Sequence, residues 1–219
     1  MAQSIDWDWI DRHSDDIREL TVKHVELVVI AVAISVVLWI PIGVLLRNRR
    51  LEFFGATTIA GLVYTIPSLA LFAFLVPTTG IGRNTVLIGL VLYSPLILMR
   101  NTVVGLQSVP GPVREAARGM GFTPLQALLK VELPLALPSI FAGIRIITVT
   151  TVGIATIGVL VGAEGLGTLI YIDGLNRDFL TPIVVGGVMA TLLAIVLDLL
   201  LLGVERLLTP WARARAGRG

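Results

Sequence analysis

The sequence predicts an all-α membrane protein, a polytopic helical bundle with five core transmembrane helices. Of the 219 residues, 55% are hydrophobic and 15% are charged, whereas soluble domains carry about 25% charged residues. Five apolar runs are each long enough to cross the hydrocarbon core of a bilayer as a helix, which takes about 20 residues. We expect helices because an open strand would leave backbone groups unpaired in lipid.

The first element is an acidic arm at residues 1–22. It lacks the basic segment and apolar core that mark a cleaved signal peptide. Trp7, Ile10 and Ile17 stand at near-helical spacing among acidic residues. We therefore expect a short amphipathic helix on the outer surface of the membrane, anchored by tryptophan. A solvated tail is the alternative.

The membrane domain is expected at residues 23–208, with a basic tail at 209–219. Its spans are predicted at about 25–46, 57–76, 85–104, 139–161 and 181–203. The third span is the least regular because Pro95 and two polar residues after it shorten the apolar run. A polar loop at 105–138 separates the third span from the fourth.

Basic residues are unevenly distributed between the two sides of this predicted bundle. One side carries eleven of them: Arg47, Arg49, Arg50, Arg100, Arg114, Arg118, Lys130, Arg206, Arg213, Arg215 and Arg218. The other side carries five: Arg12, Arg18, Lys23, Arg83 and Arg177. By the positive-inside rule, we expect the N-terminus outside and the polar loop and C-terminus in the cytoplasm.

The polar loop contains the stretch REAARGMGFTPLQALLKVELPLALP, at residues 114–138. Small and apolar residues at i, i+3, i+4 and i+7 from Val113 predict a helix. Gly121 is expected to end this helix, since glycine tolerates the left-handed conformation. Thr123 and Pro124 are expected to start a second one, as a hydroxyl cap followed by proline.

Two prolines lie beyond this second helix. Pro134 and Pro138 are expected to end it and to turn the chain toward the fourth span. The two short helices then form an elbow that rests either on lipid headgroups or on another protein. The small residues of the first helix favour close packing against protein, whereas a helix on the membrane surface more often shows bulky aromatics and lysines.

The spacing within this stretch resembles the EAA motif of ABC importer permeases. That motif is Glu-Ala-Ala, three residues, Gly, nine residues, an aliphatic residue, one residue and Leu-Pro. The matching residues here are Glu115, Ala116, Ala117, Gly121, Val131, Leu133 and Pro134. In that family the loop docks in a groove of a cytoplasmic ATP-binding subunit, so the resemblance implies that these residues couple ATP hydrolysis to the spans.

Further segments resemble the permeases of glycine betaine, choline and carnitine importers. They are TIPSLALFAFL (65–75), LYSPLILMRNTVVGL (92–106), VELPLALPSIFAGIR (131–145) and GAEGLGTLIYIDGL (162–175). The similarity covers roughly residues 24–203. It implies the MetI-like ABC importer permease fold and import of a small quaternary-ammonium or zwitterionic compatible solute by alternating access. It also implies the cytoplasmic membrane of a prokaryote.

The resemblance further implies partners and a division of labour. Two cytoplasmic ATP-binding subunits would hold ATP and Mg, because this sequence has no GxxxxGK[ST] segment. A second permease, identical or a sister chain, and an extracytoplasmic substrate-binding protein would complete the transporter. The chain itself is expected to contact membrane lipid, to bind no nucleic acid, metal or other cofactor, and to catalyse no reaction. Without cysteine it cannot form disulfides or thiolate metal sites.

Charged residues inside spans are candidates for function because they are costly to place in lipid. Arg145 in the fourth span and Asp198 in the fifth lie at similar predicted depths. We expect them to form an intramembrane ion pair that braces the inner half of the bundle. The alternative is that Arg145 extends to the headgroups.

Polar residues and prolines in the spans are candidates for the translocation pathway. They are Tyr64, Pro67, Ser68, Tyr93, Thr148, Thr151 and Glu164. The tyrosines and prolines mark expected helix breaks that open backbone carbonyls toward a cavity. The threonines either line a polar conduit or permit close helix packing. Glu164 departs from the GAGGLG pattern of the family, which has a small residue at this position.

Three classes of function remain open at this stage. The leading one is the permease of an ATP-driven importer for compatible solutes, with another small solute as its variant. A secondary transporter or channel that works without ATP would explain the spans but not the EAA spacing, and no inverted repeat is visible in the sequence. A membrane scaffold would not need kinked spans dotted with polar residues.

Overall fold

The computed structural model describes residues 5–211, and every regular element in that range is a helix. The first half contains α1 (Trp7–Arg12), α2 (Ser14–Leu46), α3 (Arg50–Thr65), α4 (Ser68–Thr79), α5 (Arg83–Tyr93), α6 (Pro95–Gln107) and α7 (Gly111–Gly119). The second half contains α8 (Pro124–Ala127), η1 (Leu128–Glu132), α9 (Leu133–Ile157), η2 (Gly158–Val161), η3 (Thr168–Gly174), η4 (Leu175–Arg177) and α10 (Leu180–Leu208). The prediction of an all-α bundle is confirmed.

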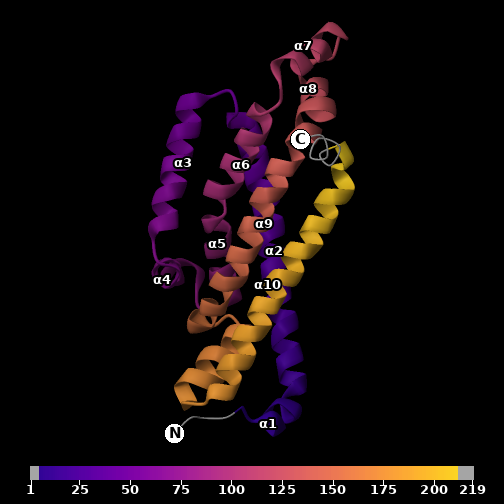
Figure 1. Cartoon of the computed structure of the whole chain (residues 1–219). Helices are drawn as coiled ribbons and strands as arrows, with labels where there is room; N and C mark the ends of the chain where they lie inside the picture. The colour runs from indigo at the N-terminus through magenta and orange to yellow at the C-terminus, as the bar shows by residue number, and fades with distance from the viewer. Residues whose placement is uncertain (1–4, 212–219) are drawn as a thin grey trace.

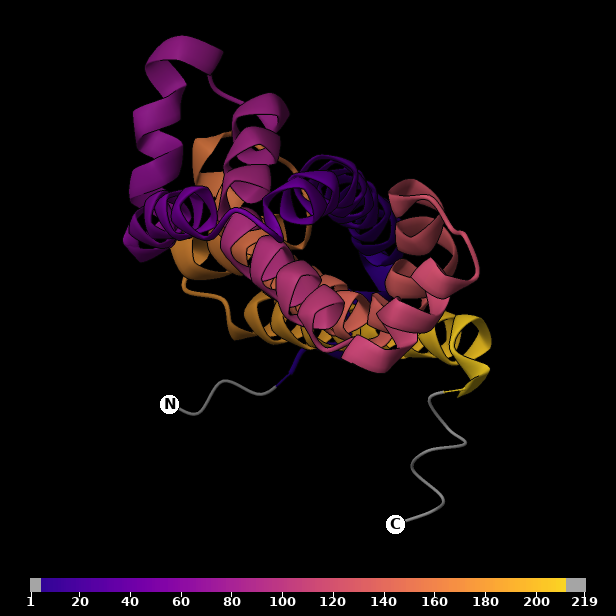
Figure 2. The ribbon, with the colours of Figure 1, turned by 90° about the horizontal axis from the view of Figure 1, so that it is seen from above.

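The long helices run between two opposite ends of the molecule (Figure 1). One end carries α1 and η3 and is called the α1 end here. The other carries α7, α8 and the last turn of α10 and is called the α7 end. In the view along the bundle, α7 and α8 lie beside α10, away from α3 and α4 (Figure 2).

The N-terminal arm begins as a capped helix and runs directly into the first span. The Asp6 carboxylate accepts the N–H of Trp9 at 2.9 Å, which caps α1. The backbone N–H of Asp6 donates to Thr181 Oγ1 at 3.0 Å and so joins the arm to the start of α10. Because α2 begins at Ser14, the expected boundary near residue 22 is not a break in the helix. Residues 1–4 of the arm lie outside the described range.

Within residues 5–211, four helices are long and apolar enough to cross a membrane, or five when the bent pair α3 and α4 is counted as one span. The predicted span at 57–76 is divided between these two helices, which meet at 100°. The reason is local: Ile66 adopts an extended conformation, with ψ of 129°, directly before Pro67. Proline disfavours the helical conformation in the residue that precedes it.

The third predicted span has only a slight interruption. α5 ends at Tyr93 and α6 starts at Pro95, with Ser94 in a helical conformation between them. The N–H of Leu98 donates to the carbonyl of Ser94 at 3.1 Å, so the hydrogen-bond ladder resumes at once. Proline at the first position of α6 costs little because its missing N–H would have no helical partner there.

The prediction that Pro134 and Pro138 end the second helix of the loop is wrong. α8, η1, α9 and η2 form one continuous helical stretch of 38 residues, Pro124–Val161. η1 is a π-helical segment in which the N–H of Leu133 donates to the carbonyl of Leu128. This wider turn ends two residues before Pro134, whose ring would clash with a carbonyl in a regular α-helix. Pro138 lies inside α9, and transmembrane helices tolerate such prolines.

The core forms where α2, α6 and α9 pack together, with α10 against α9. Leu98, Leu106 and Ile147 are almost fully buried there. Glycine permits a close approach of α6 and α9, because a Cβ at Gly143 would lie 2.8 Å from the Cβ of Asn101.

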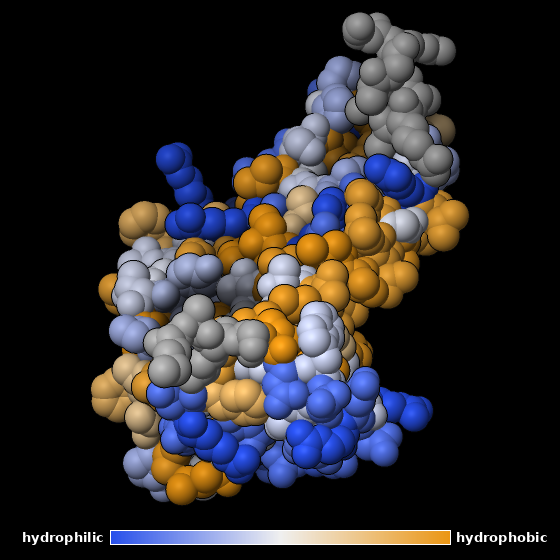
Figure 3. Space-filling view, turned by 60° about the horizontal axis from the view of Figure 1, so that its bottom comes forward, coloured by the Kyte–Doolittle hydropathy of each residue, from blue (hydrophilic) through white to orange (hydrophobic). Residues whose placement is uncertain are grey.

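The outer surface is apolar along its flank and polar at its ends. Large hydrophobic side chains of α10 are exposed, among them Val188, Leu192 and Leu199. Hydrophobic residues cover much of this flank, and hydrophilic ones gather at the α1 end (Figure 3). A soluble protein would not expose a contiguous apolar flank, whereas a membrane protein presents one to lipid.

Candidate functional site

The polar loop forms a tip that projects from the α7 end (Figure 1). Gly121 has a φ of 80°, in the left-handed region. The N–H groups of Gly121 and Phe122 donate to carbonyls in the last turn of α7 at 2.9 and 3.1 Å, which is the Schellman motif. Thr123 then starts α8 through a reciprocal capping box with Gln126. The predicted helix end at Gly121 and helix start at Thr123 are confirmed.

The residues of the EAA pattern divide between the surface of the tip and its base. The exposed members on the tip are Glu115, Ala116 and Gly121. Ala117 is buried, and α7 packs against α8 and η1. The half-buried members at the base, where η1 passes into α9, are Val131, Leu133 and Pro134. The second helix of the tip, α8, thus continues without a break into the fourth span.

Four of the pathway candidates gather around the break between α3 and α4. The rings of Tyr64 and Tyr93 meet edge to face with centroids 5.9 Å apart. The hydroxyl of Tyr93 donates to the carbonyl of Ile66, the last residue before Pro67. The break therefore leaves the carbonyl of Ile66 available to a side chain, and Tyr93 is its partner. Ser68 follows as the first residue of α4.

The two threonine candidates lie on α9 and are both buried. The hydroxyl of Thr148 donates to the carbonyl of Ile144 in its own helix at 2.8 Å. Thr151 lines a small hollow together with Tyr93 and Ser94. Thr151 is therefore close to the tyrosine group, whereas the hydroxyl of Thr148 is engaged within α9.

Glu164 lies away from these residues, at the α1 end. Its carboxylate pairs with Lys23 of α2, which also contacts Glu19 at 2.6 Å. The side chain of Glu164 is 65% exposed. The residue that departs from the family pattern thus joins the loop before η3 to the first span.

The loop around Glu164 has a second, buried attachment that sequence analysis missed. His24 is fully buried, and its Nδ1 accepts the backbone N–H of Leu166 at 3.3 Å. Its Nε2 lies 3.2 Å from the carbonyl of Val152, so this nitrogen carries the proton. A Cβ at Gly165 would lie 2.8 Å from the histidine ring. The one signal in the sequence is that His24 directly follows Lys23, so that both side chains can reach the same loop.

Arg145 and Asp198 are in direct contact through two parallel hydrogen bonds. Arg145 Nε and Nη2 donate to the carboxylate oxygens of Asp198 at 2.7 and 2.8 Å. Glu205, about two helical turns further along α10, lies 3.7 Å from Arg145 Nη1. Glu205 was not among the residues expected here, although its spacing of seven residues from Asp198 places both on one face of a helix.

The chain matches the family model described as "binding-protein-dependent transport system inner membrane component" over residues 39–213. It is 42% identical over 193 residues to the choline transport system permease protein OpuBB of Bacillus subtilis, covering 87% of each chain. It is 40% identical over 196 residues to the osmoprotectant import permease protein OsmW of Salmonella typhimurium, covering 87% of this chain and 91% of the relative.

The fold is also similar to solved structures. A chain of the methionine ABC transporter MetNI in an inward-facing conformation superposes with a TM-score of 0.80 at 25% sequence identity. The match covers 88% of this chain and 96% of the other. The MetI-like fold expected from the sequence is therefore confirmed.

Proposed function

This chain belongs to the family of binding-protein-dependent transport system inner membrane components, and on that premise we propose that it is the permease of an ATP-driven importer for a small quaternary-ammonium or zwitterionic solute. Choline, glycine betaine and carnitine are the solutes named for its relatives. The observation that carries this proposal is the identity to such permeases along most of the chain.

The proposed orientation places the α7 end in the cytoplasm and the α1 end outside. Arg47, Arg114, Arg118 and Lys130 lie toward the α7 end, which the positive-inside rule assigns to the cytoplasm. The remaining basic residues of the predicted tail, Arg213, Arg215 and Arg218, lie outside the described range. The N-terminal arm would then rest on the outer face of the membrane.

In this orientation the tip is where ATP-binding subunits dock. Glu115 and Ala116 are exposed on it, and Gly121 fixes the corner between its two helices. Two such subunits would supply ATP and Mg, and a second permease would pair with this one. An extracytoplasmic binding protein would deliver the solute at the α1 end. Closure of the ATP-binding subunits would move the tips, and α9 would carry that motion into the membrane.

The solute would pass near the break between α3 and α4. Tyr64 and Tyr93 present aromatic rings there, and aromatic faces attract quaternary ammonium groups. Tyr64 is 39% exposed, whereas Tyr93 is buried and holds the carbonyl at the break. Tyr64 is therefore the better candidate for direct contact, with Tyr93 as its support. Selection of the solute would reside mainly in the binding protein.

The test is uptake by cells that lack other importers of these solutes and express this chain with its neighbouring transporter genes. Radiolabelled choline, glycine betaine and carnitine are supplied separately, with methionine as the control solute. Accumulation of at least one of the three, but not of methionine, supports the proposal. Accumulation of methionine alone would assign the chain to another solute class, and accumulation of none would contradict the proposal.

A further inference from the structure

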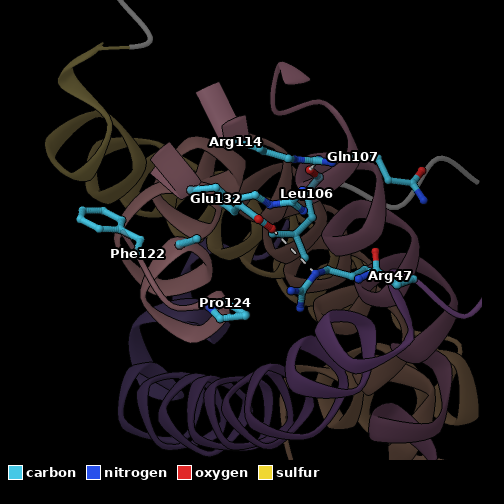
Figure 4. A pocket seen from close by; sticks show the side chains of 10 residues that line it. Arg47, Leu106, Gln107, Arg114, Phe122, Pro124 and Glu132 are labelled. Carbon is cyan, nitrogen blue, oxygen red and sulfur yellow. Dashed lines mark hydrogen bonds and ion pairs between the residues drawn. The ribbon is translucent and has the colours of Figure 1, made fainter. Parts of the chain in front are cut away.

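A polar hollow of about 330 Å³ opens at the α7 end, between the ends of α2 and α6 and the segment α7–η1 (Figure 4). Its polar lining consists of Arg47, Asn48, Gln107, Arg114, Arg118 and Glu132. Arg47 directly follows the last residue of α2, so the hollow lies where the first span leaves the apolar part of the bundle. Neither the EAA pattern nor the pathway candidates account for it.

The charges around this hollow do not balance. Three guanidinium groups line it, and Glu132 is the only acidic residue among the lining. Glu132 lies 3.8 Å from Arg47 Nε, a long contact. Within residues 5–211, neither Arg114 nor Arg118 forms an ion pair with a carboxylate. Three like charges around one hollow repel each other unless an anion joins them.

Capping of helix ends explains part of this arrangement but leaves donors unused. Arg47 Nη1 donates to the carbonyl of Val44 at 3.1 Å, and Arg114 Nη2 donates to the carbonyl of Leu106. Arg114 Nε, however, is buried and has no partner among the described residues. Across residues 5–211, the guanidinium group of Arg118 makes neither a hydrogen bond nor an ion pair with another residue. Buried donors in folded proteins normally have a partner.

We propose that this hollow binds a phosphate-class anion. Guanidinium groups bind phosphate through paired hydrogen bonds and lose little hydration on doing so. Basic hollows at the end of a helical bundle, next to the membrane surface, accept phospholipid headgroups. The same chemistry accepts free phosphate, so the two sources are distinguished by experiment.

A bound anion would connect the bundle to the tip. Arg47 belongs to the end of α2, whereas Arg114 and Arg118 belong to α7. An oxyanion shared between them would hold α7 against α2 and fix the angle at which the tip projects. This consequence rests on the proposed function, since it concerns coupling to ATP. The binding itself depends on neither the solute nor the ATP-binding subunits.

The test uses the full-length chain, purified with any subunits that remain bound, in nanodiscs. In the lipid arm, nanodiscs of phosphatidylcholine with one quarter phosphatidylglycerol are analysed by native mass spectrometry for retained phosphatidylglycerol. In the free-anion arm, inorganic phosphate is titrated calorimetrically into nanodiscs of phosphatidylcholine alone. Potassium chloride keeps the ionic strength constant and serves as the blank.

Two variants test the hollow, and a third provides the control. Arg118→Gln removes a guanidinium from the lining, and Gln107→Glu adds a negative charge to it. Arg50→Gln removes an equal charge from an exposed position at the same end, outside the hollow. Arg118→Gln should weaken anion binding about tenfold, the effect of losing one hydrogen bond to a charged group. Gln107→Glu should weaken it as well, because the new carboxylate repels an anion and pairs with the arginines in its place. The control should leave it unchanged.

The two arms of the experiment distinguish a lipid headgroup from a free anion. Retention of phosphatidylglycerol that both hollow variants reduce, and Arg50→Gln does not, assigns the site to a lipid headgroup. Saturable phosphate binding with the same dependence assigns it to a free anion. Equal effects of Arg118→Gln and Arg50→Gln, or no binding above the chloride blank, would overturn the proposal. It would also be overturned if Arg118→Gln released an ATP-binding subunit and left both anions bound as in the unaltered chain.

Discussion

Arg145 on α9 and Asp198 on α10 form a two-pronged ion pair, with both N–O distances below 3 Å. Both side chains are 28% exposed. The pair joins the last two spans, and each charge compensates the other. We propose that it fixes the relative position of these helices during transport.

Removing one partner of this pair should destabilise the chain. Asp198→Asn leaves Arg145 with only the longer contact to Glu205, and we expect a loss of about 2.5 kcal/mol, the cost of an unpaired charge within a span. Thermal unfolding in detergent measures this loss. Exchanging the two residues, Arg145→Asp with Asp198→Arg, should restore most of the stability and of the transport activity. If the exchanged variant is no more stable and no more active than the single variants, the contact between Arg145 and Asp198 is not the cause of the loss. Glu205→Gln is the control and should cost under about 1 kcal/mol.

Gly121→Ala should weaken the coupling between ATP hydrolysis and transport without lowering the amount of protein in the membrane. Gly121 has a φ of 80° with open space around it, so an added Cβ meets no neighbour but strains the backbone. That strain costs about 1–2 kcal/mol and should tilt the second helix of the tip. Gly119→Ala is the matched control, since Gly119 is helical and equally open. The measurement is solute-stimulated ATP hydrolysis per transporter. Equal rates for both variants would contradict the role of the corner.

Gly143→Ala should loosen the contact between α6 and α9. Its new Cβ would lie 2.8 Å from the Cβ of Asn101, a distance that forces the helices apart. Overpacking of this kind costs about 1–3 kcal/mol. Gly153→Ala on the same helix meets nothing within 4 Å and should be neutral or stabilising. Thermal unfolding of the purified chain compares the two, and a neutral Gly143→Ala would show that α6 and α9 are not closely packed.

Tyr93→Phe should free the carbonyl of Ile66 at the α3–α4 break. We expect a loss of about 1 kcal/mol of stability, the net value of one hydrogen bond, together with a lower maximal uptake rate. Tyr64→Phe keeps the ring that contacts Tyr93 and should leave stability unchanged. Parallel uptake and unfolding measurements test this pair. If the two variants have the same stability and the same uptake rate, the hydrogen bond of Tyr93 to the carbonyl of Ile66 contributes to neither.

Glu164→Gln should leave the affinity for solute almost unchanged, because the carboxylate is already paired with Lys23 at an exposed site. The stability loss should stay below about 1 kcal/mol, as is usual for exposed ion pairs. The concentration dependence of uptake gives the KM. A tenfold rise in KM with unchanged protein level would instead place Glu164 in contact with the solute.

The helices of this protein could largely be predicted from the sequence because long apolar runs have few alternatives in a membrane. The same holds for the corner at Gly121 and Thr123, where short-range backbone chemistry decides the structure. The pairing of Arg145 with Asp198 followed from the cost of burying charge. In each of these cases the deciding interaction is local or has a single available partner.

What escaped prediction depends on tertiary context. Pro134 and Pro138 were expected to end a helix, but the π-helical turn of η1 accommodates Pro134, and nothing in the residue types announces such a turn. A break near Pro67 was expected, but the 100° angle between α3 and α4 was not. His24 bonds to residues more than 100 positions away, so its role appears only once α2 and α9 are side by side.

The central claim is that this chain moves a compatible solute only when ATP-binding subunits act on its tip. The most direct measurement is uptake of radiolabelled choline, glycine betaine and carnitine into proteoliposomes that contain this chain, its ATP-binding subunits and its binding protein. We predict uptake with ATP, none with a non-hydrolysable analogue, and a strong reduction by Glu115→Lys at the exposed surface of the tip. Equal uptake without ATP, or by the chain alone, would contradict the account.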